Sequence, residues 1–160
     1  MQIAIISDTH MPRGDRRLPP ACVARLRAAD VIIHAGDLMR LSVLEDLRAL
    51  GRVVAVHGNV DDAAVRAALP ERAVVACEGA RLGVVHDAGP STGRLRRMRA
   101  RFPDADAVIF GHSHIPLHER DADFQIFNPG SPTERRRSPQ HTMGIAAVHA
   151  GVLEFELIAL

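Results

Sequence analysis

Short runs rich in β-branched residues recur along the first two thirds of the chain, and each leads into polar or glycine residues. The runs occupy residues 3–6, 31–34, 53–56, 82–86 and 107–110. Runs of this length and composition predict buried strands. Helices are expected between them at 20–29, 42–50, 61–69 and 91–101. The alternation of strand and helix favours a largely parallel sheet with crossover helices, which is the α/β class.

The last third of the chain has a different pattern. From Ile115 onward, strand-like segments are joined by tight turns, and Ala150 and Gly151 mark a final hairpin. This pattern predicts a second, more antiparallel sheet stacked on the first. The most loop-like stretch is 131–140, in which two prolines bracket three arginines.

Composition limits the classes of protein to which the chain can belong. With 160 residues, 47% of them hydrophobic, we expect one globular domain over 1–160. The net charge of +1 gives no general reason to expect nucleic acid or a membrane as the main partner. The start of the chain does not resemble a signal peptide and no apolar stretch approaches a membrane span, so we expect a cytoplasmic location. Cys22 and Cys77 are predicted to be reduced core thiols.

Polar side chains follow all five predicted strands. A single histidine or Asp-x-His pattern at a strand end is usually structural, but five consecutive strand ends with such groups point to a shared site. In an open α/β sheet, ligands bind at the carboxyl ends of the strands, where the loops converge. The candidate ligands are Asp8, His10, Asp37, Asn59, His86, His112 and His114.

The donor types favour a particular kind of ion. Carboxylate, amide and imidazole groups without thiolate favour Mn, Fe, Co, Ni or Zn over calcium. Seven donors exceed the needs of one tetrahedral site, so two ions that share a bridging carboxylate are the economical arrangement. Asp37 is the candidate bridge.

Six motifs carry a resemblance to a known family: SDTH (7–10), HAGD (34–37), HGNVD (57–61), VVHD (84–87), GHSH (111–114) and NPGS (128–131). Together they resemble the calcineurin-like metallophosphoesterases, in particular small phosphodiesterases of the YfcE type. The resemblance covers residues 3 to about 131. It implies an α/β fold of two packed mixed sheets flanked by helices.

The resemblance also implies a ligand set and a mechanism. One ion, with Mn favoured, would be held by Asp8, His10, Asp37 and His114, and the other by Asp37, Asn59, His86 and His112. Ions ~3.5–4 Å apart would activate a bridging hydroxide for attack on phosphorus. Asp37, Asn59 and His112 would be the catalytic residues, and Asn59 would also contact the substrate.

Some positions depart from the family pattern or remain open. Val60 stands where some relatives have a histidine that assists the leaving group, so esters with good leaving groups are expected to be preferred. Asp87 follows His86 where relatives usually have glycine, and it could orient an imidazole or simply face solvent in a turn. His34 and His57 are either outer groups of the site or structural. Arg135 and Arg13 are candidates for phosphate recognition, although solvated arginines are the more usual case.

Several functions fit the same scaffold. We expect a small phosphodiester as the substrate, while a phosphomonoesterase, a nucleotide pyrophosphatase and a non-catalytic scaffold module stay as alternatives. Scaffold relatives tend to lose ligands, and this chain keeps all seven, which favours catalysis. A homo-oligomer is possible.

Overall fold

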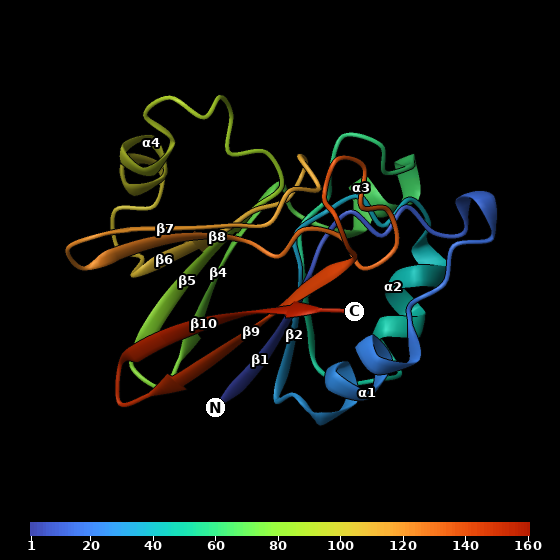
Figure 1. The fold of residues 1–160 in the computed structure, drawn as a ribbon, viewed down its shortest axis with the longest axis horizontal. Coiled ribbons are helices and arrows are strands. Elements are labelled where there is room, and N and C mark those ends of the chain that lie inside the picture. The colour runs from blue at the N-terminus through green and yellow to red at the C-terminus, as the bar shows by residue number, and fades with distance from the viewer.

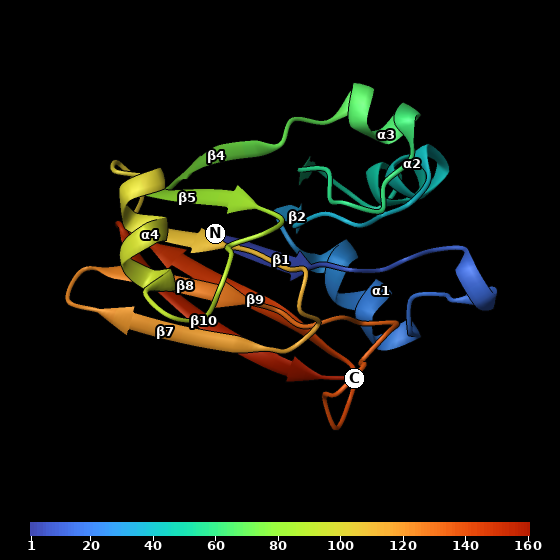
Figure 2. The same cartoon turned by 90° about the horizontal axis from the view of Figure 1, so that it is seen from above.

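The structure, a computed structural model that describes residues 1–160, has four layers in the order helix, sheet, sheet, helices (Figures 1 and 2). Figure 2 shows α4 on one side of the paired sheets and α1, α2 and α3 on the other. The helices are α1 (Pro20–Ala28), α2 (Leu41–Arg48), α3 (Ala63–Ala68) and α4 (Arg94–Arg101), with a short 3-10 helix η1 (Arg13–Asp15).

The first sheet has the strand order β10-β9-β1-β2-β3. Its strands are β1 (Gln2–Ile6), β2 (Val31–His34), β3 (Val53–Ala55), β9 (Thr142–His149) and β10 (Val152–Ala159). β1, β2 and β3 run parallel, as their crossover helices require, whereas β9 and β10 are antiparallel to their neighbours.

The second sheet has the strand order β4-β5-β6-β8-β7. Its strands are β4 (Arg72–Cys77), β5 (Ala80–Val85), β6 (Ala107–Ile109), β7 (Leu117–Asp121) and β8 (Phe124–Asn128). β5, β6 and β8 are parallel, and the hairpins β4-β5 and β7-β8 place antiparallel strands at both edges. Two mixed sheets flanked by helices confirm the expected fold class.

Alternation along β1 shows how one strand supplies two cores. Ile3 and Ile5 face the second sheet and pack with Val84 and Ile109 between the sheets. The intervening residues face α1 and α2 instead, because successive side chains of a strand point to opposite faces. A third core packs α4 against the outer face of the second sheet. Both faces of both sheets are therefore at least partly covered by apolar contacts.

The structure corrects two expectations. β4 was not predicted, although residues 73–77 form a short apolar run; it is an edge strand in which Arg72, Val74 and Ala76 are exposed. The strands of the last third do not form a sheet of their own: β7 and β8 join the second sheet, while β9 and β10 join the first. Chain order therefore does not follow sheet membership.

No helix combines the length and the apolar character that a membrane span needs.

Candidate metal centre

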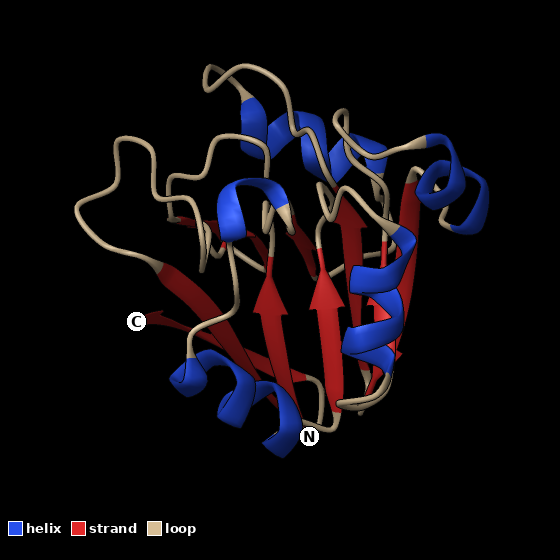
Figure 3. Ribbon diagram, turned by 90° about the vertical axis from the view of Figure 1, so that its right-hand side faces the viewer, coloured by secondary structure: helices blue, strands red, loops and turns tan.

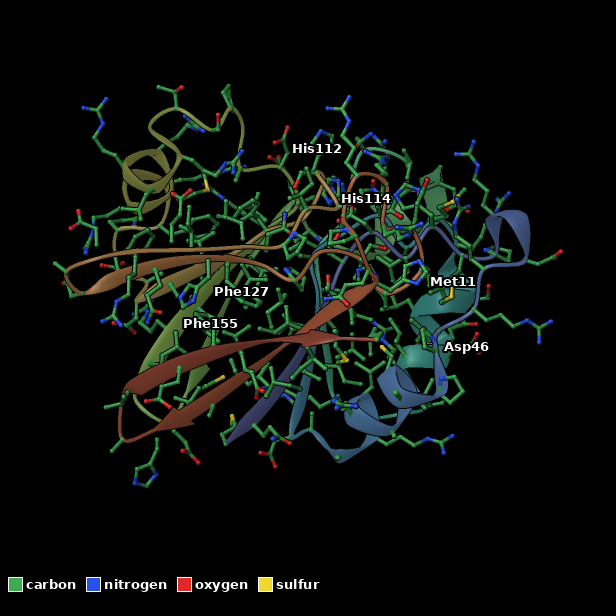
Figure 4. All side chains as sticks on the ribbon, viewed as in Figure 1. Met11, Asp46, His112, His114, Phe127 and Phe155 are labelled. Atoms are coloured by element: carbon green, nitrogen blue, oxygen red, sulfur yellow. The ribbon has the colours of Figure 1, made fainter.

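All the candidate ligands lie at one end of the two sheets. Figure 3 shows the loops that follow the parallel strands gathered at that end, and Figure 4 places His112 and His114 there. β1, β2 and β3 of the first sheet lead into Asp8, His10, Asp37 and Asn59, and β5 and β6 of the second lead into His86, His112 and His114. The sequence prediction that these groups share one rim is in agreement with this arrangement.

Asp8, His10 and His114 form the first group of possible ligands, and all three are buried. Oδ1 of Asp8 lies 3.4 Å from Nε2 of His114 and 4.0 Å from Nε2 of His10. The carboxylate of Asp8 also accepts hydrogen bonds from the hydroxyl of Ser7 (2.7 Å) and from the backbone N–H of His112. Asp8 is thereby fixed in place by neighbours from both sheets.

Asn59, His86 and His112 lie together as the second group, and His86 also forms a set of possible metal ligands with Asp8 and Asp37. Oδ1 of Asn59 lies 3.1 Å from Nε2 of His86 and 3.0 Å from Nδ1 of His112. The two imidazoles are themselves 3.3 Å apart at these nitrogens. His86 is buried, whereas Asn59 and His112 are exposed, so this side of the centre is open to solvent.

Asp37 lies between the two groups. Its Oδ2 atom is 3.4 Å from Nε2 of His10 and 3.2 Å from Nε2 of His86. Its other oxygen accepts the backbone N–H of Val60 at 3.0 Å. A carboxylate that faces a histidine from each group has the position that a bridging ligand requires.

Three imidazole nitrogens of the first group lack a hydrogen-bond partner within the chain. Both ring nitrogens of His10 and Nε2 of His114 are buried without a hydrogen bond. A buried polar atom without a partner costs roughly 1–3 kcal/mol, so native proteins rarely leave three together. The donors are imidazole, carboxylate and amide groups, which suit borderline divalent ions. The residues present therefore fit such ions.

Charges in the centre are strongly coupled. Burial raises the pKa of Asp8 to about 6, with nearby His86 acting in the opposite direction. Burial would also raise the pKa of Asp37, but the close imidazoles of His10 and His86 outweigh it and hold the pKa well below the usual range. Burial lowers the pKa of His86, yet Asp37 and Asp8 raise it to about 9. This network balances acidic and basic groups and is typical of a functional site.

The backbone at these ligands is unusual. Left-handed φ values occur at five of them: Asp8 (56°), His10 (47°), Asp37 (62°), His112 (70°) and His114 (60°). Non-glycine residues adopt this region infrequently, although Asp and His tolerate it better than most. The turns direct consecutive polar side chains toward the same point.

Two glycines leave the space that the carboxylates occupy. A Cβ atom at Gly58 would lie 2.0 Å from Oδ1 of Asp37, and one at Gly111 would lie 1.8 Å from Oγ of Ser7 and 2.6 Å from Oδ2 of Asp8. The close approach at both glycines is to ligand side chains.

Several of the remaining sequence candidates have structural partners, whereas Nδ1 of His57 is buried without a hydrogen bond. His34 is completely buried, and its ring contacts the Thr9 hydroxyl (3.1 Å) and accepts the Gly36 N–H. Asp87 is exposed and caps its own turn through Gly89 N–H, as a solvated turn aspartate would. Arg135 donates to Ser138 and Pro139 carbonyls within its own loop, and Arg13 is exposed.

Sequence reasoning gave no specific role to Asp61. Its carboxylate accepts backbone N–H groups of Asp37 (3.2 Å), Met39 (2.6 Å) and Gly58 (2.6 Å) and so joins the loops after β2 and β3. The HGNVD motif contained this residue. The spacing of the motif does not show that the carboxylate of Asp61 accepts backbone N–H groups.

A hollow of about 340 Å³ opens beside Asn59 and His86. Its other walls include Arg66 and Arg101, and its only apolar lining residue is Val85. Arg66 donates to the carbonyls of Asn59 (2.6 Å) and Asp61 (2.9 Å), and Arg101 pairs with Glu71 at 2.8 Å. Neither arginine is part of one of the six motifs, so no sequence signal indicated their place beside the centre.

Comparison with known proteins gives concordant results. The family model of the calcineurin-like phosphoesterase superfamily domain matches residues 1–151. A probable metallophosphoesterase of Methanocaldococcus jannaschii is 35% identical over 139 residues, which cover 85% of this chain and 70% of that protein.

Solved structures share the fold. One described as a novel archaeal phosphodiesterase has a TM-score of 0.78 and 22% identity, and the match covers 100% of both chains. Wild-type Vps29 from Entamoeba histolytica, solved in complex with Zn²⁺, has a TM-score of 0.79 and 21% identity over 99% of both chains. At this identity the likeness concerns the fold alone.

Proposed function

Because the chain belongs to the calcineurin-like phosphoesterase superfamily, we propose that it is a divalent-metal-dependent hydrolase of small phosphodiesters. The observation that carries the proposal is the position of Asp37, whose Oδ2 faces His10 of one ligand group and His86 of the other. A shared carboxylate is what a two-ion centre needs. A structural ion pair would require only one of these contacts.

The proposed ligand sets follow the two groups. Asp8, His10, Asp37 and His114 would hold one ion, and Asp37, Asn59, His86 and His112 the other, with Mn²⁺ favoured and Fe, Co, Ni or Zn as alternatives. Bound ions would lower the pKa of a water and neutralise phosphoryl oxygens.

The chain's own groups would position the ester. Oδ1 of Asn59 faces two imidazoles, so its amide N–H₂ is available to donate to a phosphoryl oxygen. Asn59 and His112 are the exposed members of the ligand set, and a substrate would reach the centre from their side.

The hollow beside Asn59 supports a small polar substrate. One apolar residue among nine lining residues offers little for a hydrophobic group. The guanidinium groups of Arg66 and Arg101 suit a phosphate. Glu71 and Asp87 in the same lining balance their charge. Val60 is exposed at this rim and cannot donate a proton. Esters whose leaving group departs without an acid should therefore react fastest, and equal rates for activated and unactivated esters of matched size would contradict this.

The test compares two model substrates. Chelator-stripped protein is assayed with bis-p-nitrophenyl phosphate and p-nitrophenyl phosphate, with and without Mn²⁺, beside Asp37→Ala. Asp46→Asn is the matched control, because Asp46 is an exposed aspartate of α2. Mn²⁺-dependent diester cleavage that Asp37→Ala abolishes would support the proposal. Faster monoester cleavage would favour a phosphomonoesterase, and no turnover with any divalent ion would overturn catalysis.

A non-catalytic scaffold module is the second candidate. It is favoured by the structural likeness to Vps29. A further similar structure is described as vacuolar protein sorting 29. The alternative would be supported by a protein that binds ions but turns over no phosphate ester.

A further inference from the structure

The loop after β8 is attached to the loop after β1 by side-chain hydrogen bonds. Oγ of Ser131 donates to the carbonyl of Asp8 at 2.8 Å, and Oγ1 of Thr133 donates to the carbonyl of Thr9 at 2.6 Å. Ser131 Oγ also accepts the N–H of Glu134 at 2.9 Å. These contacts hold Glu134 at a defined place behind the first ligand group.

The carboxylate of Glu134 faces His10. Oε2 of Glu134 lies 3.4 Å from Nδ1 of His10, and both atoms are buried without a hydrogen-bond partner. The other oxygen of Glu134 pairs with Arg16 at 3.2 Å, and Arg16 in turn donates to the carbonyl of Arg13. The carboxylate is thereby held in a fixed orientation with one oxygen directed at the imidazole.

The backbone of the same residue serves the second histidine of the group. The carbonyl oxygen of Glu134 lies 2.6 Å from Nδ1 of His114. A carbonyl can only accept, so the Nδ1 of His114 carries the proton and Nε2 is left with its lone pair. Nε2 of His114 lies 3.4 Å from Asp8, on the side where the other ligands meet.

We propose that Glu134 is the positioning residue of the first ligand group, with its carboxylate orienting His10 and its carbonyl orienting His114 so that both Nε2 atoms are presented to one divalent cation. An acceptor behind each ring fixes the tautomer and increases the basicity of the coordinating nitrogen. The inference rests on the metal centre of the proposed function. It assigns to one residue the orientation of two ligands that precede it by 124 and 20 positions (134 − 10 and 134 − 114).

The two groups should respond differently to a change at this position. Glu134 contacts His10 and His114 of the first group, and the contacts described for Asn59, His86 and His112 do not involve it. Removal of the carboxylate should therefore weaken one of two bound ions and leave the other almost unchanged. A general loss of structure would weaken both.

The experiment is a titration of the chelator-stripped full chain with Mn²⁺ in competition with a chromophoric chelator. The wild type is expected to bind two equivalents. Glu134→Ala should weaken one by about 10- to 100-fold, the usual effect of losing an outer partner of a metal-bound histidine, with the other changed less than about twofold. Glu134→Gln keeps an acceptor oxygen, so its affinity for the weakened equivalent should lie between those of the wild type and Glu134→Ala. Glu119→Ala, at an exposed position of β7, is the matched control.

Arg16→Met provides a second variant that leaves Glu134 in place, and it should weaken the binding of the same equivalent by a smaller factor.

In metal-free protein, nitrogen NMR of the imidazoles should show the proton of His10 on Nδ1 in the wild type and a mixture of tautomers in Glu134→Ala. Unchanged affinity of both equivalents in Glu134→Ala, or equal loss of both, would overturn the inference. Two equivalents with the expected asymmetry but no ester hydrolysis would support it while refuting the proposed activity, and a wild type that binds no ion would refute both.

Discussion

Oδ2 of Asp37 lies 3.2 Å from Nε2 of His86, and the two residues lie in loops that follow strands of different sheets. Replacing Asp37 with Asn keeps the size of the side chain but removes the charge that faces His10 and His86. We expect Asp37→Asn to lower Mn²⁺-dependent diester hydrolysis by at least about 100-fold, since both proposed ions lose the charged carboxylate that they share. The measurement is kcat/KM at saturating Mn²⁺, with Asp46→Asn as the control. Wild-type activity in Asp37→Asn would exclude a bridging role.

Gly111→Ala should damage the centre through packing. The new Cβ would lie 1.8 Å from Ser7 Oγ, so Ser7 or the adjacent carboxylate of Asp8 must move. We expect a loss of about 1–3 kcal/mol in the free energy of unfolding and weaker Mn²⁺ binding. Urea denaturation and Mn²⁺ titration measure the two effects. Gly51→Ala is the control, because its Cβ would meet Ile32 only at 3.7 Å; similar losses in both variants would argue against a specific clash.

His34 should make the metal-free protein sensitive to acid. Burial lowers the pKa of His34 to about 3, whereas an unfolded histidine titrates near 6.5. Between these values the unfolded chain holds a proton that the native ring does not. The stabilising contribution is thus complete above pH 6.5 and is lost as the pH falls toward 3, with a slope of up to about 1.4 kcal/mol per pH unit.

His34→Gln tests this pH dependence in chelator-treated protein. The difference in unfolding free energy between wild type and His34→Gln should be largest at pH 7 and should shrink by up to about 2 kcal/mol at pH 5. Comparing the two proteins cancels the opposite slope of Asp8, whose pKa burial raises to about 6. The exposed His149→Gln is the control. A difference that stays constant between pH 7 and 5 would contradict a buried neutral His34.

Arg101→Ala should affect substrates according to their charge. Arg101 lines the hollow beside Asn59 and is partly exposed, with 29% of its side chain accessible. For a diester that carries a second phosphate group, we expect KM to rise up to about fivefold, in keeping with a partly exposed charge pair. KM for bis-p-nitrophenyl phosphate should change less. Arg96→Ala, an exposed arginine of the same helix, is the control; equal effects of both variants would mean that the hollow does not hold the second phosphate.

The sequence predicted the family and most of the parallel strands, because both depend on local patterns. It did not predict that β5 and β6 belong to the second sheet or that β8 runs parallel to β6. A strand such as β1 is a continuous apolar run, and polar groups directly after it must lie at the carboxyl end of its sheet. The resemblance to calcineurin-like enzymes and the two mixed sheets are confirmed. The assignment of individual ligands to ions stays a prediction.

Contacts between segments far apart in the sequence could not be predicted. Nothing near β9 in sequence indicates that it pairs with β1 while β8 pairs with β6. The loop 131–140 drew attention to Arg135 because arginines suit phosphate, yet the neighbouring Glu134 makes the contacts to His10 and His114. A glutamate between threonine and arginine has no local signature of that role, since its partners come from remote segments.

The position of the ligands at the ends of two sheets has a consequence for biosynthesis. Asp8, Asp37 and Asn59 follow strands of the first sheet, which also needs β9 and β10 from the end of the chain, whereas His86 and His112 follow strands of the second sheet. A nascent or proteolytically cut chain that lacks either half would have an incomplete coordination sphere. Tight Mn²⁺ binding should therefore require the fully folded chain. Fragments 1–70 and 71–160 should each fail to retain Mn²⁺ alone and should bind it only after they reassemble.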